Sequence, residues 1–222
     1  VTDIALADLP AAGVIGGMFA GDNHLRADLV LRDGLARIVA ASLNGPRLDL
    51  RAEGQYSAEA PDLAVILDRL DLRALTEGGR GALTGRAQLA GEGGTTRYAL
   101  NVLGEGPLRT GIGSVDAMIG TGLTLEARAT GTADGALQID TARLEAQGLR
   151  ATLSGLQQAS GAARFALDAV IENIGALVPG IAGRITLDSR VTRAEGDAGY
   201  GVEARLAGPS ALAATATGRV ND

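Results

Sequence analysis

Hydrophobic and polar residues alternate with a period of two along most of the chain. Residues 122–128 read GLTLEAR, in which leucine and alanine alternate with threonine, glutamate and arginine. The same alternation occurs in segments 24–32, 46–53, 184–192 and 200–206. Successive side chains of a strand point to opposite faces, so each segment is predicted to be a strand with one apolar face and one charged face. Helical spacing at i, i+3 and i+4 fits these segments poorly.

Turn-forming residues separate the alternating segments. Clusters that combine Gly with Asn, Asp, Glu or Pro lie at 32–34, 44–46, 91–94, 133–135 and 195–197. Glycine, asparagine and aspartate tolerate the positive φ angles of tight hairpin turns. We therefore predict about a dozen strands, mostly joined as hairpins into an antiparallel meander. A meander of this pattern has one wet, charged face and one apolar face that needs cover.

Four short apolar segments interrupt the alternation. They are residues 9–20, 72–77, 114–119 and 174–178, and a glycine follows each of them closely. A glycine after a short apolar segment is typical of a helix C-terminus, so we predict short helices or helical turns at these places.

The order of strands and helical turns occurs about twice in the chain. Gly155 in the sequence LRATLSG lies 101 residues after Gly54 in LDLRAEG. We interpret residues 1–222 as one repetitive β segment of a larger protein, with approximate units 3–107 and 108–222. Repetition of this kind favours an extended array over a globular enzyme.

The composition changes how the apolar face is interpreted. Glycine accounts for 33 of 222 residues, which suits many tight turns, and hydrophobic residues reach 46% although aromatic residues are only 2%. The apolar side chains are therefore mostly small or aliphatic, whereas a packed sandwich of this size usually contains more large aromatic anchors. The aromatic residues are Phe19, Tyr56, Tyr98, Phe165 and Tyr200.

The charge pattern argues against a nucleic-acid partner. The net charge is −6 and is spread without long runs, whereas nucleic-acid binding needs a basic stripe. The chain has no cysteine, so it has neither a disulfide nor a thiolate metal site. The longest nearly apolar run, at 11–21, is about half of the length that a bilayer span needs.

Residues that could carry catalysis are few. His24 is the only histidine, and a nucleophile–base pair or a zinc site normally needs more than one imidazole. The carboxylates Asp134, Asp140 and Glu145 fall on separate turns and strands, where solvated side chains are expected. The glycine-rich segments 104–106 and 111–113 lack the spacing of a phosphate-binding loop. We expect no enzyme activity, no cofactor and no metal site.

The apolar alternate positions are then the candidate functional residues. A dozen strands spaced about 4.8 Å apart extend roughly 60 Å, so their apolar faces together would form a long trough that could enclose acyl chains. The gain would be about 0.8 kcal/mol per buried methylene. The candidate lining residues are Leu29, Leu31, Leu48, Leu50, Leu123, Leu125, Leu137, Ile139, Phe165, Leu167, Ile185, Leu187, Val202 and Leu206.

Residues 108–155 resemble the repeats of the TamB family, the inner-membrane subunits of the translocation and assembly module, which are related to AsmA-like envelope proteins. The resemblance rests on the TGI lead-in, the helical turn that contains Asp116, the strand LTLEARA and the strand pair in LEAQGLRATLSG. It implies a long antiparallel sheet that is curled into an apolar-lined groove, a β-taco. It also implies a periplasmic location, as part of a protein anchored in the inner membrane of a Gram-negative bacterium.

The resemblance further implies phospholipids as cargo, and a TamA-like outer-membrane barrel as a partner through regions outside this sequence. The expected function is then a segment of a periplasm-spanning bridge that supports lipid transport and outer-membrane protein assembly. Two alternatives remain open at this point. One is a chaperone-like scaffold that templates barrel strands by β-augmentation, and the other is a structural β-solenoid of a secreted adhesin.

Overall fold

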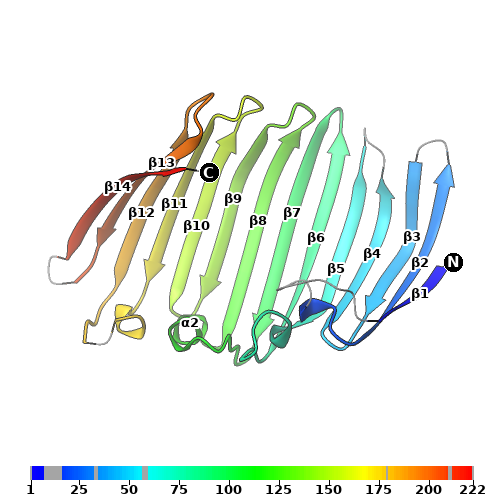
Figure 1. Ribbon diagram of the computed structural model, residues 1–222, viewed down its shortest axis with the longest axis horizontal. Helices are drawn as coiled ribbons and strands as arrows, with labels where there is room; N and C mark the ends of the chain where they lie inside the picture. Colours follow the sequence, from blue (N-terminus) through cyan, green and yellow to red (C-terminus); the bar gives the residue numbers. More distant parts are fainter. Residues whose placement is uncertain are drawn as a thin grey trace.

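The strands of the described residues form one open antiparallel sheet. The structure, a computed structural model, describes residues 2–7, 17–32, 35–56, 60–178, 180–209 and 212–221. Fourteen strands follow one another in the sheet in the order of the sequence, which confirms the predicted all-β meander (Figure 1). The strands are β1 (Thr2–Ala7), β2 (Asp22–Arg32), β3 (Leu35–Asn44), β4 (Leu48–Tyr56), β5 (Asp62–Asp71), β6 (Ala82–Glu92), β7 (Thr95–Glu105), β8 (Gly122–Thr132), β9 (Leu137–Ala146), β10 (Leu149–Gln157), β11 (Ala163–Ile171), β12 (Ile185–Arg193), β13 (Gly199–Ala207) and β14 (Ala213–Asn221).

The predicted helix at 114–119 is confirmed in full, whereas the predicted helical segments at 72–77 and 174–178 are helical over fewer residues than expected. Helix α2 spans Gly113–Ile119, whereas η1 (Leu72–Ala74) and η2 (Ile174–Ala176) are single 3₁₀ turns. Of the predicted helix at 9–20, Gly17 and Met18 are helical, and residues 9–16 lie outside the described residues. The predicted hairpin turn that includes residues 33 and 34 also lies partly outside them.

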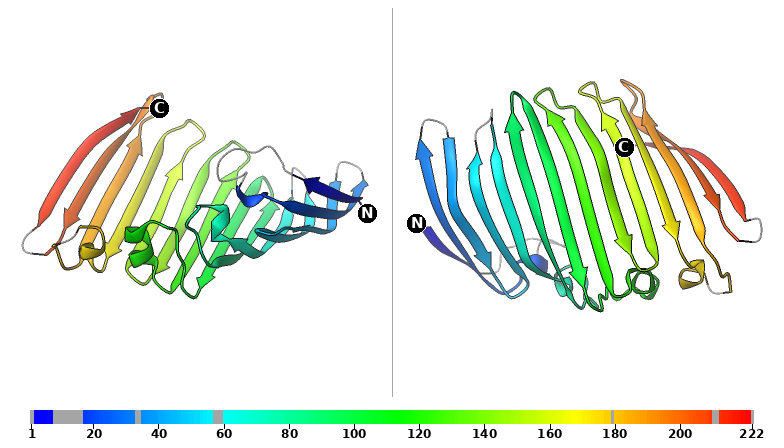
Figure 2. Two further views of the ribbon diagram at one scale, coloured as in Figure 1. Left: turned by 60° about the horizontal axis from the view of Figure 1, so that its bottom comes forward. Right: turned by 180° about the vertical axis from the view of Figure 1, so that it is seen from behind.

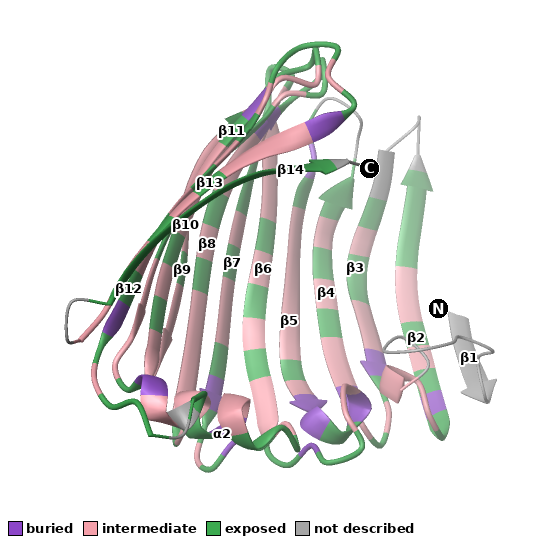
Figure 3. Ribbon diagram, turned by 60° about the vertical axis from the view of Figure 1, so that its left-hand side comes forward, coloured by how far each residue is buried: buried purple, intermediate pink, exposed green. Residues whose placement is uncertain are grey.

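The helical segments all lie at one end of the strands. They belong to the connections β1–β2, β5–β6, β7–β8 and β11–β12, which meet at the lower edge of the sheet in Figure 1. The sheet is twisted and curled, and β13 and β14 bend toward the side that carries these segments (Figures 2 and 3). The two long edges of the sheet therefore differ: helical connections occupy one, and hairpin turns occupy the other.

Two glycines allow neighbouring strands to approach closely. Gly54 in β4 has φ 137°, and a Cβ built there would lie 2.1 Å from the carbonyl oxygen of Asp62 in β5. Gly155 occupies the matching place in β10, where a Cβ would lie 2.5 Å from the carbonyl oxygen of Arg164 in β11. Both glycines also face an irregularity in the preceding strand, because the registers of β3 with β4 and of β9 with β10 shift beside them.

Alanine at Gly54 or Gly155 should therefore destabilise the sheet. We expect the free energy of unfolding to fall by about 1–3 kcal/mol for each variant, because the new Cβ meets backbone that cannot move aside. Gly218→Ala in β14 is the matched control, since a Cβ there meets no atom within 4 Å. Urea unfolding followed by circular dichroism measures the three variants. Equal stabilities would show that these close approaches do not constrain the fold.

Candidate functional site

One face of the sheet is apolar in unbroken rows that run across the strands. Cross-strand pairing places Leu125 of β8 between Val102 of β7 and Leu144 of β9. The paired residues can be followed in the same way from strand to strand, and they form a row from β2 to β14. In this row, here named the central row, every residue is apolar or glycine. Its members are Leu25, Leu43, Leu50, Leu67, Gly85, Val102, Leu125, Leu144, Ala151, Ala169, Leu187, Leu206 and Ala214.

A furrow of small side chains runs beside the central row. The next row toward the hairpin turns has alanine on β2–β4, β6, β8, β9, β13 and β14, and Val65, Leu100, Leu153, Leu167 and Ser189 on the other strands. The row beyond it again carries large side chains, such as those of Leu63, Leu89 and Phe165. Where an alanine of this row lies between larger side chains of the two neighbouring rows, each about 6.6 Å away along the strand, it leaves a depression. We name this feature the alanine furrow.

The furrow opens into a measurable hollow at the middle of the sheet. The hollow has a volume of about 460 Å³ and is lined almost entirely by apolar atoms from β5 to β8. Ala87 and Ala127 belong to the furrow row, and Leu63, Leu89 and Tyr98 to the row of large side chains beyond it. This volume lies within the usual range of small-molecule sites, about 300–1,000 Å³.

No second sheet covers the apolar face among the described residues, which form a single sheet. Large side chains on this face are therefore in contact with solvent: Leu31 is 76% exposed, Leu29 is 54% exposed and Tyr98 is 42% exposed. Contiguous apolar surface of this kind marks an interaction site rather than a finished core. The open face answers the question that the alternating pattern left undecided, namely whether a second layer covers it.

Among the described residues, the buried leucines and isoleucines of the apolar face are gathered at one end of the strands. Leu43, Leu48, Leu70 and Ala74 form a buried cluster there, and Met18 and Phe19 pack against it. Further along the same end, Leu108 is 1% exposed and fills the space above Gly104. We name the connections that cover this end the base strip.

Hydrogen bonds join successive connections of the base strip. Arg80 and Arg109 exchange two backbone hydrogen bonds of 2.9 Å, and Thr76 donates its hydroxyl to the carbonyl of Thr110 at 2.6 Å. Farther on, the amide of Gly148 donates to Met118 and the amide of Glu172 donates to Gly148. The base strip therefore closes one long side of the apolar face as a continuous unit.

Capping side chains hold the helical turns of the base strip in place. The Asp71 carboxylate accepts a hydrogen bond from the Arg73 amide at 2.9 Å, and the Arg73 guanidinium lies 2.5 Å from the same carboxylate. The guanidinium lowers the pKa of Asp71 to about 2, with a smaller effect from the Arg73 amide. Asn173 caps the second turn in the same way through the amide of Gly175.

All fourteen predicted lining residues belong to the apolar face, but at different depths. Leu50, Leu125, Leu187 and Leu206 lie in the central row, and Leu167 lies in the furrow row. The row of large side chains beyond the furrow contains Leu29, Ile139, Phe165 and Val202. Leu31 and Leu137 lie near the hairpin turns, and Leu48, Leu123 and Ile185 lie at the base.

Two of the predicted lining residues are buried. Leu48 and Ile185 are each 5% exposed, because base-strip residues and the segment before β14 pack over them. They belong to the floor of the groove and are not available to contact a ligand. The sequence pattern could not separate them from the open positions, since burial here comes from connections that are distant along the chain.

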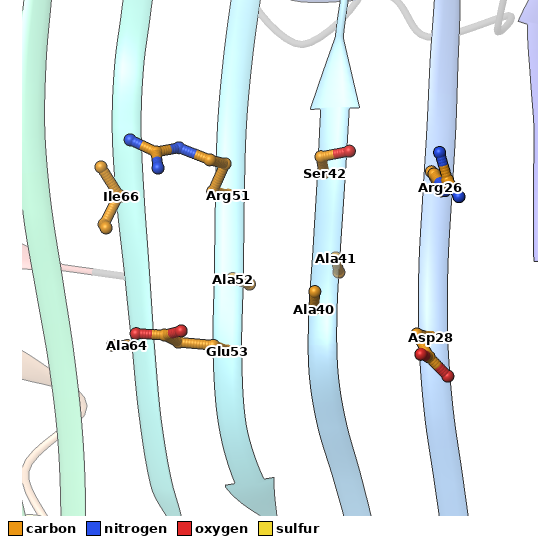
Figure 4. A pocket seen from close by; sticks show the side chains of 10 residues that line it. All are labelled: Arg26, Asp28, Ala40, Ala41, Ser42, Arg51, Ala52, Glu53, Ala64 and Ile66. Atoms are coloured by element: carbon orange, nitrogen blue, oxygen red, sulfur yellow. The ribbon is translucent and has the colours of Figure 1, made fainter. Parts of the chain in front are cut away.

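The opposite face is charged and carries its own hollows. One, of about 480 Å³, lies over β2–β5 and is shown in Figure 4. Arg26 and Arg51 face it together with Asp28 and Glu53, so its charges balance, and Arg51 is also paired with Asp68 at 2.5 Å. A larger hollow, of about 1,160 Å³, lies mainly over the charged face of β9–β14. Both hollows are lined by positive and negative side chains, whereas the hollow over β5–β8 is lined almost entirely by apolar atoms. We therefore take the hollow over β5–β8 as the candidate site.

The residues considered for catalysis serve structural roles or are exposed. His24 is exposed within β2. The Asp134 carboxylate accepts hydrogen bonds from the hydroxyl of Thr132 and the amide of Ala136, so it stabilises the β8–β9 turn, and the Thr132 hydroxyl lowers its pKa. Gly111 allows close contact with Gly78 between two connections of the base strip. Over the described residues, no three acidic, histidine or cysteine side chains group as metal ligands would.

The fold and the site define a class of structure: a single open antiparallel sheet with one continuous apolar face and one charged face. Comparisons of the chain with protein-family models, with curated proteins and with solved structures gave no match. The resemblance to the TamB family therefore stays a prediction from the sequence. Within the described residues, the helices are too short or too polar to cross a bilayer.

Asp71→Ala should loosen the base strip, because it removes both the helix cap and the ion pair with Arg73. We expect a loss of about 1 kcal/mol in the free energy of unfolding. Asp71→Asn should cost about half as much, since an amide oxygen can still cap the turn, as Asn173 does. Urea unfolding at neutral pH tests this order.

The charge on Asp71 also predicts a pH dependence. Its folded pKa of about 2 lies below the ordinary value of 3.8, so its contribution is present above about pH 4 and is lost as the pH falls through 2. The difference in the free energy of unfolding between the wild type and Asp71→Asn should become smaller as the pH falls from 4 to 2. A difference that stays constant from pH 4 to pH 2 would contradict the assigned role of the ion pair.

Proposed function

We propose that this chain is a segment of a lipid-carrying bridge, in which the apolar face binds acyl chains along the alanine furrow. The observation that carries the proposal is the continuity of the apolar rows from β2 to β14. A site for one compact ligand would need apolar residues on a few strands only, whereas a conduit needs them on every strand. No polar side chain interrupts the central row.

The energetics suit a mobile apolar chain. About ten methylene groups withdrawn from water would contribute roughly 8 kcal/mol before the cost of lost freedom is subtracted. The contacts are nondirectional, so the chain can shift along the furrow without breaking specific hydrogen bonds. The alanines of the furrow row leave room for an acyl chain, and Leu100, Leu153 and Leu167 in the same row offer it apolar contacts on β7, β10 and β11.

The resemblance to the TamB family supports a role in the bacterial envelope. Under the proposal, the bridge spans the periplasm from an inner-membrane anchor, its cargo is phospholipid, and a TamA-like barrel binds regions outside this sequence. Protein assembly at the outer membrane would then depend on lipid delivery along the groove. The chemistry at the site is solvation, and the proposed role is not enzymatic.

Of the two alternatives, templating of barrel strands keeps a structural basis. β14 has one neighbour in the described sheet, and its described side chains are exposed. Binding of a barrel strand at such an edge would use backbone hydrogen bonds and would not depend on the furrow. The adhesin solenoid fits poorly, because a solenoid stacks successive coils, whereas this chain forms one antiparallel meander.

Leu125→Asp tests the conduit. A carboxylate in the middle of the central row should lower acyl-chain binding at least tenfold, because an acyl chain cannot solvate the charge. Thr130→Asp on the same strand is the matched control, since Thr130 lies on the charged face opposite Arg97. Native mass spectrometry and photocrosslinking with a phospholipid that carries a diazirine in its acyl chain measure the binding.

The outcomes separate the candidate functions. Loss of crosslinking in Leu125→Asp alone, with an unchanged circular dichroism spectrum, supports the conduit. Equal crosslinking in the wild type and both variants would sink it. Binding of unfolded barrel strands that is insensitive to Leu125→Asp would favour templating at the sheet edge, and dimers that form only with an intact apolar face would favour a self-association surface.

A further inference from the structure

Polar side chains on the apolar face are concentrated at the edge that carries the hairpin turns. The last row before these turns, here named the rim row, combines apolar side chains such as those of Leu31, Leu137 and Val220 with the polar side chains of Thr96, Gln157 and Arg193 and, near its two ends, of Tyr56 and Tyr200. Tyr98 lies one row deeper. The furrow row and the central row together contain a single polar side chain, that of Ser189. The apolar face therefore has a polarity gradient that runs along the strands.

All three tyrosines of the chain lie at the open side of this gradient. A tyrosine ring has an apolar body and a polar tip, which is why tyrosine is enriched where hydrocarbon meets polar headgroups. Tyr56 is 54% exposed and Tyr98 is 42% exposed, so their surfaces are available to a ligand. The two phenylalanines, in contrast, lie elsewhere: Phe165 in the row beyond the furrow and Phe19 against the base.

The base of the groove is filled mainly by apolar side chains, and its one buried amide, that of Asn23, donates to the carbonyls of Phe19 and Gly21. Leu43, Leu48 and Leu70 are buried there under the base strip. A headgroup placed at the base would lose its hydration without gaining hydrogen bonds, which is costly for a neutral group and more costly for a charged one. The buried leucines of the base therefore favour an orientation in which the headgroup of a bound amphiphile points away from them.

One cation is positioned on the rim row. Among the described side chains of β2–β14, Arg193 is the only charged residue in register with the apolar face. Its guanidinium lies 5.2 Å from the centre of the Tyr200 ring, donates to the Tyr200 hydroxyl at 3.3 Å and donates to the carbonyl of Asp197 at 2.9 Å. These contacts hold the side chain at the hairpin end of β12, where Arg193 also lines the large hollow over the charged face.

We infer that the groove binds amphiphiles in one orientation, with acyl chains in the alanine furrow and headgroups at the hairpin rim, where Arg193 and Tyr200 contact an anionic headgroup. This inference rests on the proposed function. It adds the edge of the sheet at which the headgroup lies, the row in which the acyl chain lies, and a preference for anionic headgroups. A guanidinium recognises a phosphate oxygen by charge-assisted hydrogen bonds, and the adjacent ring packs against the glycerol and upper acyl chain.

Single cysteines can measure the orientation, because the chain contains none of its own. Thr96→Cys samples the rim row, Ala127→Cys samples the furrow, and Thr130→Cys on the charged face is the control. Each variant is labelled with bimane and mixed with phosphatidylglycerol that carries a nitroxide quencher either on the headgroup or near the end of an acyl chain. The headgroup quencher should act at least about twofold more strongly at position 96 than at 127, and the acyl-chain quencher should show the reverse order.

The results distinguish this inference from the proposed function. The orientation is overturned if each nitroxide quencher acts equally at positions 96 and 127, or if the order of the two positions is reversed for each quencher. Either result would leave acyl-chain binding intact. Absence of quenching at both positions overturns the orientation and the proposed function together. Quenching at position 130 as strong as at 127 would show nonspecific adsorption and would also overturn both.

Arg193→Gln tests the charge preference. The variant should lower the preference for phosphatidylglycerol over phosphatidylcholine by about threefold to tenfold, because it removes a charge-assisted hydrogen bond and keeps the length of the side chain. Arg190→Gln lies on the same strand but on the charged face, so it removes the same net charge away from the rim. An equal change in both variants, or no change in Arg193→Gln, would overturn the role of Arg193.

Discussion

Cross-strand register is the constraint on which the whole structure depends. A shift of one residue in any strand would move its leucines to the charged face and interrupt every apolar row. The register is irregular at several places, for example beside Leu29 in the pairing of β2 with β3 and between Leu67 and Leu70 in the pairing of β5 with β6. Each irregularity is a bulge with extra residues in one strand, and the side chains on either side of the bulge keep to the same face of the sheet. For example, Leu50 pairs with Leu67 and Leu48 pairs with Leu70, and all four lie on the apolar face. The apolar rows survive because the irregularities preserve the facing of the leucines.

Local pattern was sufficient to predict the strands and the side of the sheet on which each candidate residue lies. Period-two alternation depends only on neighbouring residues, so it located Leu123 and Leu125 on one face and Glu126 on the other before any pairing was known. It could not predict that Leu48 and Ile185 are buried, because the covering atoms come from the base strip, whose segments meet through contacts such as that between Arg80 and Arg109. Nor could it reveal the rim row, since that row exists only after the strands are aligned with one another.

The two halves of the sheet use similar local solutions. β4 and β10 both contain nine residues, with Gly54 and Gly155 at their seventh positions, and each is followed by a strand that leads into a capped 3₁₀ turn. The caps differ in chemistry, with Asp71 in one and Asn173 in the other, yet each accepts a hydrogen bond from an amide two residues later. Because only the aspartate pairs with an arginine, the first turn alone carries a charge-dependent contribution.

The asymmetry between the two long sides gives the apolar face its direction. If both sides were open, an apolar ligand could bind across the sheet with no preferred orientation. If both were covered, the leucines would form an ordinary core and no ligand could enter. Here the base strip withdraws Leu43 and Leu70 from water, whereas Leu29 and Leu31 stay in contact with it near the hairpin turns. Under the proposed function, an acyl chain would gain the hydrophobic free energy that the fold leaves ungained at the open side, and it would lie across the strands because the apolar rows run in that direction.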